Sequence, residues 1–208
     1  MKNTASILPN SADTFTLGRS VDNNYMIGVR LKQGILNSSR SIKRGNQFSN
    51  SVDTVSSDLR PMVKLVGNIH GNEPVGRELL IHFARYILTA AKTPKNQRDS
   101  LAQRAANILK MTDLWILPSM NPDGFKRAKE GKCSGDGYSS GRTNAGFKDL
   151  NRDFPTWKDM QILRQGNESH DIFKSRQQEI NLVMRWILDN PFVLSACFHD
   201  GAVVVGYP

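Results

Sequence analysis

Three short apolar runs limit the folds that this chain can adopt. Each has the length and the large or β-branched residues of a buried strand: Met62–Ile69, Leu114–Leu117 and Phe192–Phe198. Between them, apolar residues at helical spacing predict helices over residues 74–91, 99–109 and 175–188. This order of elements predicts an α/β protein, a three-layer sandwich in which helices cover both faces of a mixed, largely parallel sheet.

Length and composition predict one globular domain. The chain has 208 residues, of which 38% are apolar and 23% are charged, so wholesale disorder is excluded. We expect residues 1–13 to be a disordered N-terminal segment and residues 14–208 to form the domain, beginning with one or two strands in residues 14–31. Residues 32–58 are rich in Ser, Asn and Gly without a sustained period, which predicts a flexible loop insertion.

The net charge of +9 raises the question of an anionic partner. The whole excess lies in residues 1–110, where the basic residues are scattered and lack interleaved aromatic residues. This pattern favours a solvated surface, so we expect no nucleic-acid partner. No apolar run is long enough to span a bilayer or to form a signal peptide, so the chain encodes no membrane association.

Polar residues follow each of the three predicted strands. His70 and Glu73 come after the first strand, the turn at residues 121–124 after the second, and His199 after the third. Ligand sites of such sheets lie at the carboxyl ends of the strands, where we expect these groups to meet. Catalytic zinc is often held by two His and one Glu. The pattern favours a zinc site at His70, Glu73 and His199, although a chance His-x-x-Glu is common.

A loop at residues 141–155 carries Arg142 and Arg152, ten positions apart. A guanidinium matches a carboxylate with two parallel hydrogen bonds, so the loop suits recognition of an anion. The alternative is a solvated loop with surface ion pairs, because Asp149 and Asp153 lie nearby.

The motifs together resemble those of the zinc metallocarboxypeptidases, and more narrowly the regulatory subgroup of carboxypeptidases D, E, M and N. The resemblance covers residues 17–208 and keeps the family's order. It rests on Gly18-Arg19-Ser20-Val21, His70-Gly71-Asn72-Glu73-Pro74, Ser119-Met120-Asn121-Pro122-Asp123-Gly124-Phe125, Gly141-Arg142, Asp149-Leu150-Asn151-Arg152-Asp153-Phe154-Pro155 and Pro191-Phe192-Val193-Leu194-Ser195-Ala196 with His199.

The resemblance implies a role for each matching residue. His70, Glu73 and His199 would hold one zinc ion. Arg142 would act catalytically by facing the developing oxyanion, and would contact the substrate. Asn151 and Arg152 would bind the C-terminal carboxylate of a peptide or protein substrate. The implied reaction is hydrolysis of C-terminal residues, Lys or Arg by analogy with the subgroup, by a water that zinc activates.

The sequence also departs from the family pattern. His199-Asp200-Gly201 stands where the family has His-Gly-Gly, so Asp200 either supports the zinc ligands or crowds them. The resemblance further implies that the family's general base lies beyond Pro208, so that this sequence corresponds to the N-terminal part of the catalytic domain, with a sheet incomplete at its C-terminal end.

Two other functions stay open at this point. Without the general base, the chain would be a non-catalytic fragment that binds zinc or peptide. A related zinc deacylase would share His-x-x-Glu and a distant His, but the motifs at residues 121–124 and 149–152 fit peptidases better. The family resemblance implies an extracellular or secretory location.

Overall fold

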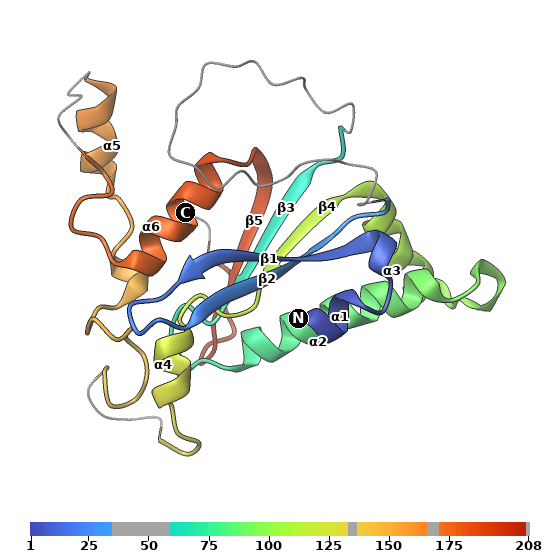
Figure 1. Cartoon of the computed structure of the whole chain (residues 1–208), viewed down its shortest axis with the longest axis horizontal. Helices are drawn as coiled ribbons and strands as arrows, with labels where there is room; N and C mark the ends of the chain where they lie inside the picture. Colours follow the sequence, from blue (N-terminus) through green and yellow to red (C-terminus); the bar gives the residue numbers. More distant parts are fainter. Residues whose placement is uncertain (35–58, 133–136, 166–170, 207–208) are drawn as a thin grey trace.

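The computed structural model describes residues 1–34, 59–132, 137–165 and 171–206 (Figure 1). Most of the loop predicted for residues 32–58 lies outside this part of the chain. The first residue of that range, Lys32, is described and does not belong to a flexible loop. Its side chain is buried, and its Nζ lies 3.5 Å from Asp113 Oδ2.

The sheet confirms the predicted α/β architecture and is mixed. Its five described strands lie in the order β1-β2-β4-β3-β5. The pairs β4–β3 and β3–β5 are parallel, whereas β1–β2 and β2–β4 are antiparallel. The strands are β1 (Ala12–Arg19), β2 (Tyr25–Leu31), β3 (Met62–Gly67), β4 (Asp113–Leu117) and β5 (Phe192–Phe198). All five residues of β4 are buried, as expected for a central strand.

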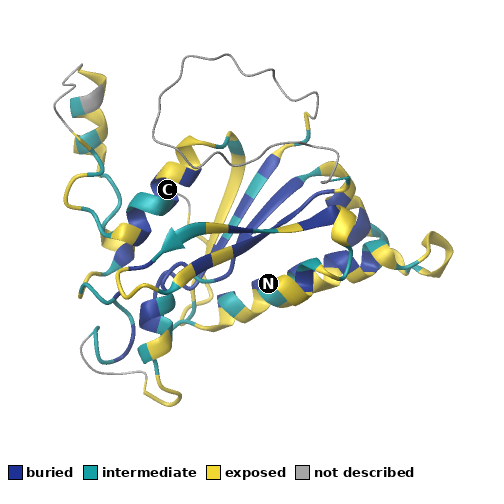
Figure 2. Ribbon diagram, in the orientation of Figure 1, coloured by how far each residue is buried: buried dark blue, intermediate teal, exposed yellow. Residues whose placement is uncertain are grey.

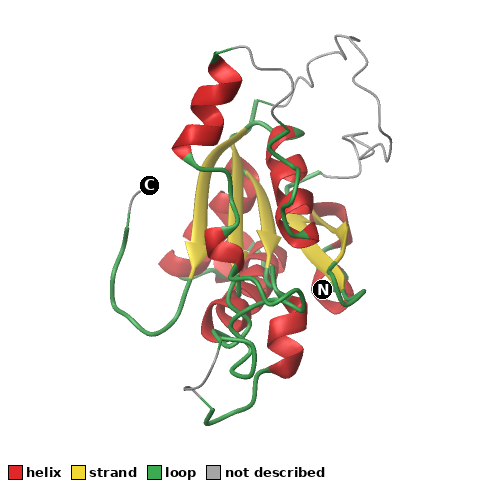
Figure 3. Cartoon of the chain, turned by 90° about the vertical axis from the view of Figure 1, so that its left-hand side faces the viewer, coloured by secondary structure: helices red, strands yellow, loops and turns green. Residues whose placement is uncertain are grey.

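Three longer helices cover the sheet, close to their predicted ranges: α2 (Val75–Lys92), α3 (Ser100–Met111) and α6 (Gln178–Leu188). The described chain also contains α1 (Lys2–Ala5), α4 (Pro122–Arg127) and α5 (Trp157–Arg164), with short 3-10 turns at Pro9–Ser11, Lys95–Gln97 and Leu150–Arg152. In Figure 3, helices lie in front of and behind the strands. No described helix is long and apolar enough to cross a membrane.

Two apolar cores lie on opposite faces of the sheet. On one face, Leu80 and Leu88 of α2 and Leu109 of α3 pack against the strands. On the other face, Ile180 and Met184 of α6 pack with aromatic residues of the sheet. Leu79 of α2 and Ile187 of α6 are apolar but exposed, so the buried stripe of each of these helices is narrower than its apolar pattern.

Three regions differ from the sequence-based expectation. Residues 1–13 contain α1 and a 3-10 turn, because Met1, Ile7 and Leu8 pack against the core beside α2. The turn expected at residues 121–124 is the start of α4, with the Asn121 side chain accepting from Gly124 N. The third apolar run forms β5 as predicted, yet it lies at an edge of the sheet and is largely exposed (Figure 2).

The parallel strands direct the polar motifs to one end of the sheet. The residues after β3 and β4 lie beside each other, with Met120 N donating to Gly67 O and Asn121 N to Asn68 O. The loop after β3 also touches α4 closely: a Cβ on Gly71 would lie 2.1 Å from the carbonyl carbon of Gly124. A side chain at position 71 would therefore force the two segments apart.

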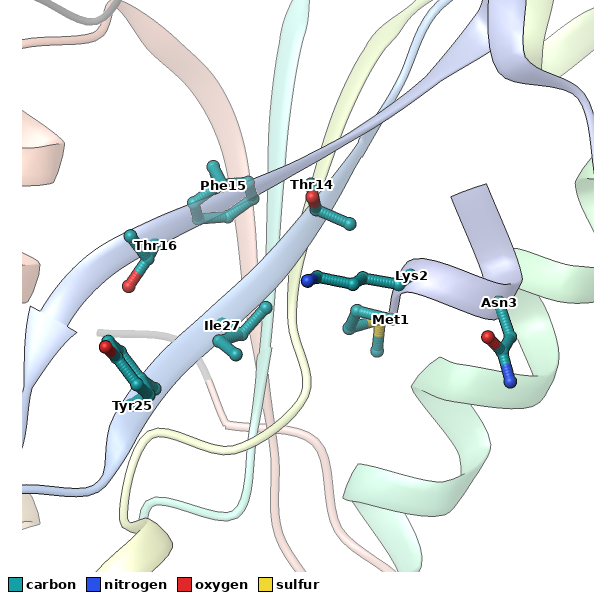
Figure 4. Close-up of a pocket in the computed structure, with 8 residues that line it drawn as sticks. All are labelled: Met1, Lys2, Asn3, Thr14, Phe15, Thr16, Tyr25 and Ile27. Carbon is teal, nitrogen blue, oxygen red and sulfur yellow. The ribbon is translucent and has the colours of Figure 1, made fainter. Parts of the chain in front are cut away.

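A cavity of about 650 Å³ lies elsewhere, along β1 and β2 near α1 (Figure 4). It is lined by Met1, Lys2, Asn3, Thr14, Phe15, Thr16, Tyr25 and Ile27. None of the candidate site residues lines this cavity.

Candidate metal centre

Asn68 shapes the loop that carries the first two candidate ligands. Its side chain is fully buried, and its backbone is left-handed, with a φ of 57°. The side-chain Nδ2 donates to the carbonyl oxygens of His70, Gly71 and Glu73 at 2.9–3.0 Å, and Oδ1 accepts from Ser119 at 2.8 Å. One amide thus fixes the turn after β3 and joins it to the end of β4.

His70, Glu73 and His199 meet at the end of the sheet, with one ligand atom from each within 4.8 Å of the others. Nδ1 of His70 lies 2.8 Å from Oε1 of Glu73, and Nδ1 of His199 lies 2.8 Å from Oε2. The two imidazole rings are 5.0 Å apart, centroid to centroid. The structure therefore brings together three residues spread over more than a hundred positions.

Asp149 joins this cluster to the arginine loop. Its Oδ1 lies 3.0 Å from His70 Nε2, the ring nitrogen that faces away from Glu73. Its Oδ2 accepts from Nε and Nη2 of Arg142 at 3.1 and 3.0 Å, and Arg142 Nη1 lies 3.5 Å from Glu73 Oε1. The ion pair considered from the sequence is thus formed by Arg142 with Asp149, and it lies against the cluster.

The surroundings keep both carboxylates ionised. Burial acts to raise the pKa of Glu73, but hydrogen bonding and attraction to His70, with bonds to His199 and Asp200, outweigh it, so the pKa is lowered. Burial opposes ionisation of Asp149 as well, yet His70 and Arg142 hold its pKa below the usual value. At neutral pH both groups carry the charge that a cation site requires.

The donor set fits zinc. Two imidazole nitrogens and a carboxylate are the ligands of many catalytic zinc sites, which leave a further position for substrate or water. Metal-binding histidines usually direct their other ring nitrogen to a carboxylate or carbonyl, as His70 does to Asp149. His70, Glu73 and His199 would hold the ion.

The predicted carboxylate-binding residues lie next to this centre. Asn151 N donates to Asp149 Oδ1 at 2.9 Å, the oxygen that also faces His70. Arg152 is exposed and its Nη1 donates to the carbonyl of Asn151 at 3.0 Å. Within the described residues no carboxylate forms an ion pair with Arg152, so its guanidinium stays accessible to an anion.

Asp200 and Cys197 lie on either side of His199 in the sequence and have distinct positions in the structure. The Asp200 carboxylate accepts from the backbone N–H groups of Val75 and Gly76, so it lies at the start of α2. Cys197 Sγ lies 3.7 Å from Nε2 of His199, the nitrogen that faces away from Glu73. Neither side chain belongs to the three-residue cluster.

Sequence reasoning missed Asn68 and the bond between Asp149 and His70. An asparagine inside an otherwise apolar run was the available signal for Asn68. The position of Asp149 could not be read from spacing, because it depends on how the loop at residues 141–155 folds back over the end of β3.

Comparison with known proteins shows which family the chain resembles along its length. The family described as zinc carboxypeptidase (peptidase M14) matches residues 1–208. Carboxypeptidase D of Drosophila melanogaster is 36% identical over 200 residues, which cover 96% of this chain and 12% of that protein. Carboxypeptidase E of Caenorhabditis elegans is 41% identical over 158 residues, covering 72% of this chain and 32% of that protein. The chain therefore spans a minor part of these relatives.

Solved structures share the fold. Carboxypeptidase A from Helicoverpa armigera superimposes with a TM-score of 0.58 at 19% identity, covering 97% of this chain and 44% of that one. A carboxypeptidase from Shewanella denitrificans gives a TM-score of 0.57 at 17% identity, covering 95% and 37%. With the match along its whole length, the chain belongs to the zinc carboxypeptidase family.

Proposed function

We propose that this chain supplies the metal centre and the carboxylate-binding residues of a metallocarboxypeptidase that removes C-terminal residues from peptides. The observation that carries the proposal is the meeting of His70, Glu73 and His199, with Arg142 Nη1 3.5 Å from Glu73. A cation site beside a positively charged side chain suits a reaction in which negative charge develops on a carbonyl oxygen.

Each side chain has a defined task in this proposal. When bound, zinc would polarise the scissile carbonyl and lower the pKa of the attacking water. Asp149 holds Arg142 against the centre, where its guanidinium stabilises the oxyanion of the tetrahedral state. Arg152 and Asn151 bind the substrate's free carboxylate, which places the last peptide bond at the metal.

The finer parts of the proposal rest on the subgroup that the motifs resemble. A preference for C-terminal Lys or Arg, a role in peptide processing and a secretory or extracellular location follow from the likeness to carboxypeptidases D and E. Peptide and protein C-termini are then the partners, and the basic surface of the N-terminal half does not bind nucleic acid.

Calorimetry with the 208-residue chain tests the proposal. We expect one zinc ion per chain and, in its presence, binding of a peptide that ends in a free Arg carboxylate. The same peptide with a C-terminal amide should bind about tenfold more weakly or worse, because it lacks the anion that Arg152 recognises. Absence of zinc binding, or equal binding of acid and amide, would contradict the proposal.

A second function, binding of zinc and peptide without turnover, is favoured by the hydrogen bonds of the carboxylates at the cluster. Among the described residues, three carboxylates at the cluster already form hydrogen bonds: Glu73 with both histidines, Asp149 with Arg142, and Asp200 with the first N–H groups of α2. A general base needs a carboxylate that is free to take a proton. Binding of the acid peptide without release of free arginine would support this function, and measurable release would exclude it.

A further inference from the structure

The start of α2 takes its cap from a residue far away in the sequence. Pro74 occupies the cap position and provides no side-chain hydrogen bond. Instead, Asp200 Oδ2 accepts from Val75 N at 2.9 Å and Oδ1 from Gly76 N at 3.3 Å. The first N–H groups of a helix have no partner within the helix, and a carboxylate both satisfies them and opposes the positive end of the helix dipole.

Asp200 also contacts the metal centre through its backbone. Its N–H donates to Glu73 Oε2 at 3.3 Å, the oxygen that faces His199 Nδ1. Since Asp200 directly follows His199 and Val75 lies two residues after Glu73, its three hydrogen bonds connect the end of β5 with the segment that carries Glu73.

The backbones of α2 and β5 also approach each other closely beside Asp200. A Cβ on Gly76 would lie 2.7 Å from Phe198 Cβ and 3.0 Å from the Phe198 carbonyl oxygen. The first turn of α2 therefore lies directly against the last residue of β5, and the missing side chain at position 76 allows this approach.

We infer that Asp200 is a positioning residue for the metal centre: by capping α2 it holds His199 in register with His70 and Glu73. The inference rests on the proposed zinc site and extends it. A glycine here, as in the family's usual His-Gly-Gly, leaves the N–H groups of Val75 and Gly76 without this carboxylate. The aspartate thus supports the ligands and does not crowd them.

The test compares zinc affinity, measured by competition with a chromophoric chelator, in the parent chain and in Asp200→Gly and Asp200→Asn. We expect Asp200→Gly to bind zinc about tenfold to a hundredfold more weakly, the range found when residues that orient metal ligands are removed. Asp200→Asn keeps one side-chain acceptor, so its zinc affinity should fall between those of the parent chain and Asp200→Gly.

Asp99→Ala provides the matched control. Asp99 caps α3, accepting from Ala102 N at 2.7 Å. In the chain it comes after the C-terminal end of α2, whereas Val75 is at the N-terminal end of that helix. This substitution should lower the thermal unfolding temperature without changing zinc affinity. Unchanged zinc affinity in Asp200→Gly, or an equal loss in Asp99→Ala, would overturn the inference.

Amide hydrogen exchange separates this inference from the zinc site itself. In the parent chain without metal, the Val75 and Gly76 amides should exchange slowly, and Asp200→Gly should accelerate both. A parent chain that shows this protection but binds no zinc would contradict the proposed function while retaining the link between α2 and β5. Equal exchange in parent and variant would refute that link.

Discussion

At the scale of single residues, the site depends on hydrogen bonds that fix both the position and the charge of each side chain. Asn68 holds the backbone of the His70 loop, and Asp149 bonds to Nε2 of the His70 ring and also to Arg142. Each candidate ligand is thus held by a partner that is itself bonded. Such preorganisation lowers the cost of ordering the ligands when the ion binds.

Replacing either histidine should remove the metal. We expect His70→Ala and His199→Ala each to lose stoichiometric zinc, because two remaining donors hold the ion far less tightly. Metal content after dialysis, measured by mass spectrometry, provides the check. His82→Ala, an exposed position on α2, is the matched control and should retain the ion. A full complement of zinc in either ligand variant would refute the ligand set.

Arg152→Ala should separate substrate binding from metal binding. Removing a charged hydrogen-bond donor to a carboxylate weakens the affinity for the free-acid peptide about tenfold to a hundredfold, while zinc affinity is unchanged. Titration calorimetry measures both constants, and Arg104→Ala on α3 serves as an exposed control. Equal peptide affinity in parent and variant would mean that Arg152 does not bind the carboxylate.

At the scale of the elements, buried charge joins the antiparallel hairpin to the parallel strands. Arg30 of β2 donates through Nε to Asp113 of β4 at 2.7 Å, and both side chains are buried. Lys32 lies 3.5 Å from the same carboxylate. Removing this carboxylate takes the anion of the pair away from the buried Arg30 guanidinium.

Asp113→Ala should therefore be strongly destabilising. We expect a loss of about 3–5 kcal/mol in the free energy of unfolding, the cost of removing one partner of a buried ion pair. Urea denaturation followed by circular dichroism measures it. The matched variant Glu78→Ala breaks an exposed pair with Arg77 and should cost less than about 1 kcal/mol. Similar losses in the two variants would show that burial does not strengthen the Asp113 contact.

The element scale also shows how far patterns in the sequence predict structure. Strands β3, β4 and β5 were predicted from short apolar runs, and helices α2, α3 and α6 from apolar residues at helical spacing. Helices α4 and α5 were missed: they are only six and eight residues long, and α4 begins in a motif typical of turns. Short helices are stabilised by their surroundings more than by their own sequence.

At the scale of the whole molecule, the two edges of the sheet differ. β1 at one edge packs against α6 and the N-terminal segment, with Phe15 and Ala12 buried. At the other edge, β5 exposes side chains on both faces: Val193 is 70% and Leu194 63% exposed. Within the described residues no strand pairs with the outer edge of β5, and an apolar edge strand is a template for pairing with another chain.

The isolated 208-residue chain should self-associate through this strand. We expect its average mass in solution to rise with protein concentration, and Leu194→Lys to reduce the rise, because a charge on an edge strand opposes pairing. Light scattering after size-exclusion chromatography measures the mass. Leu101→Lys alters an isolated exposed leucine on α3 and should have no effect. A parent chain that stays monomeric across the series would contradict the prediction.

The sequence by itself determined at which strand ends the candidate ligands lie, because the apolar runs and the positions of His, Glu and Arg can be read along the chain. Only the tertiary structure decided that Asp149 bonds His70, that Asp200 caps α2 and that β2 pairs with β4. These contacts join residues separated by 79 to 125 positions or lying on strands that do not follow one another in the chain. Their formation depends on how the layers pack, and no local pattern encodes that packing.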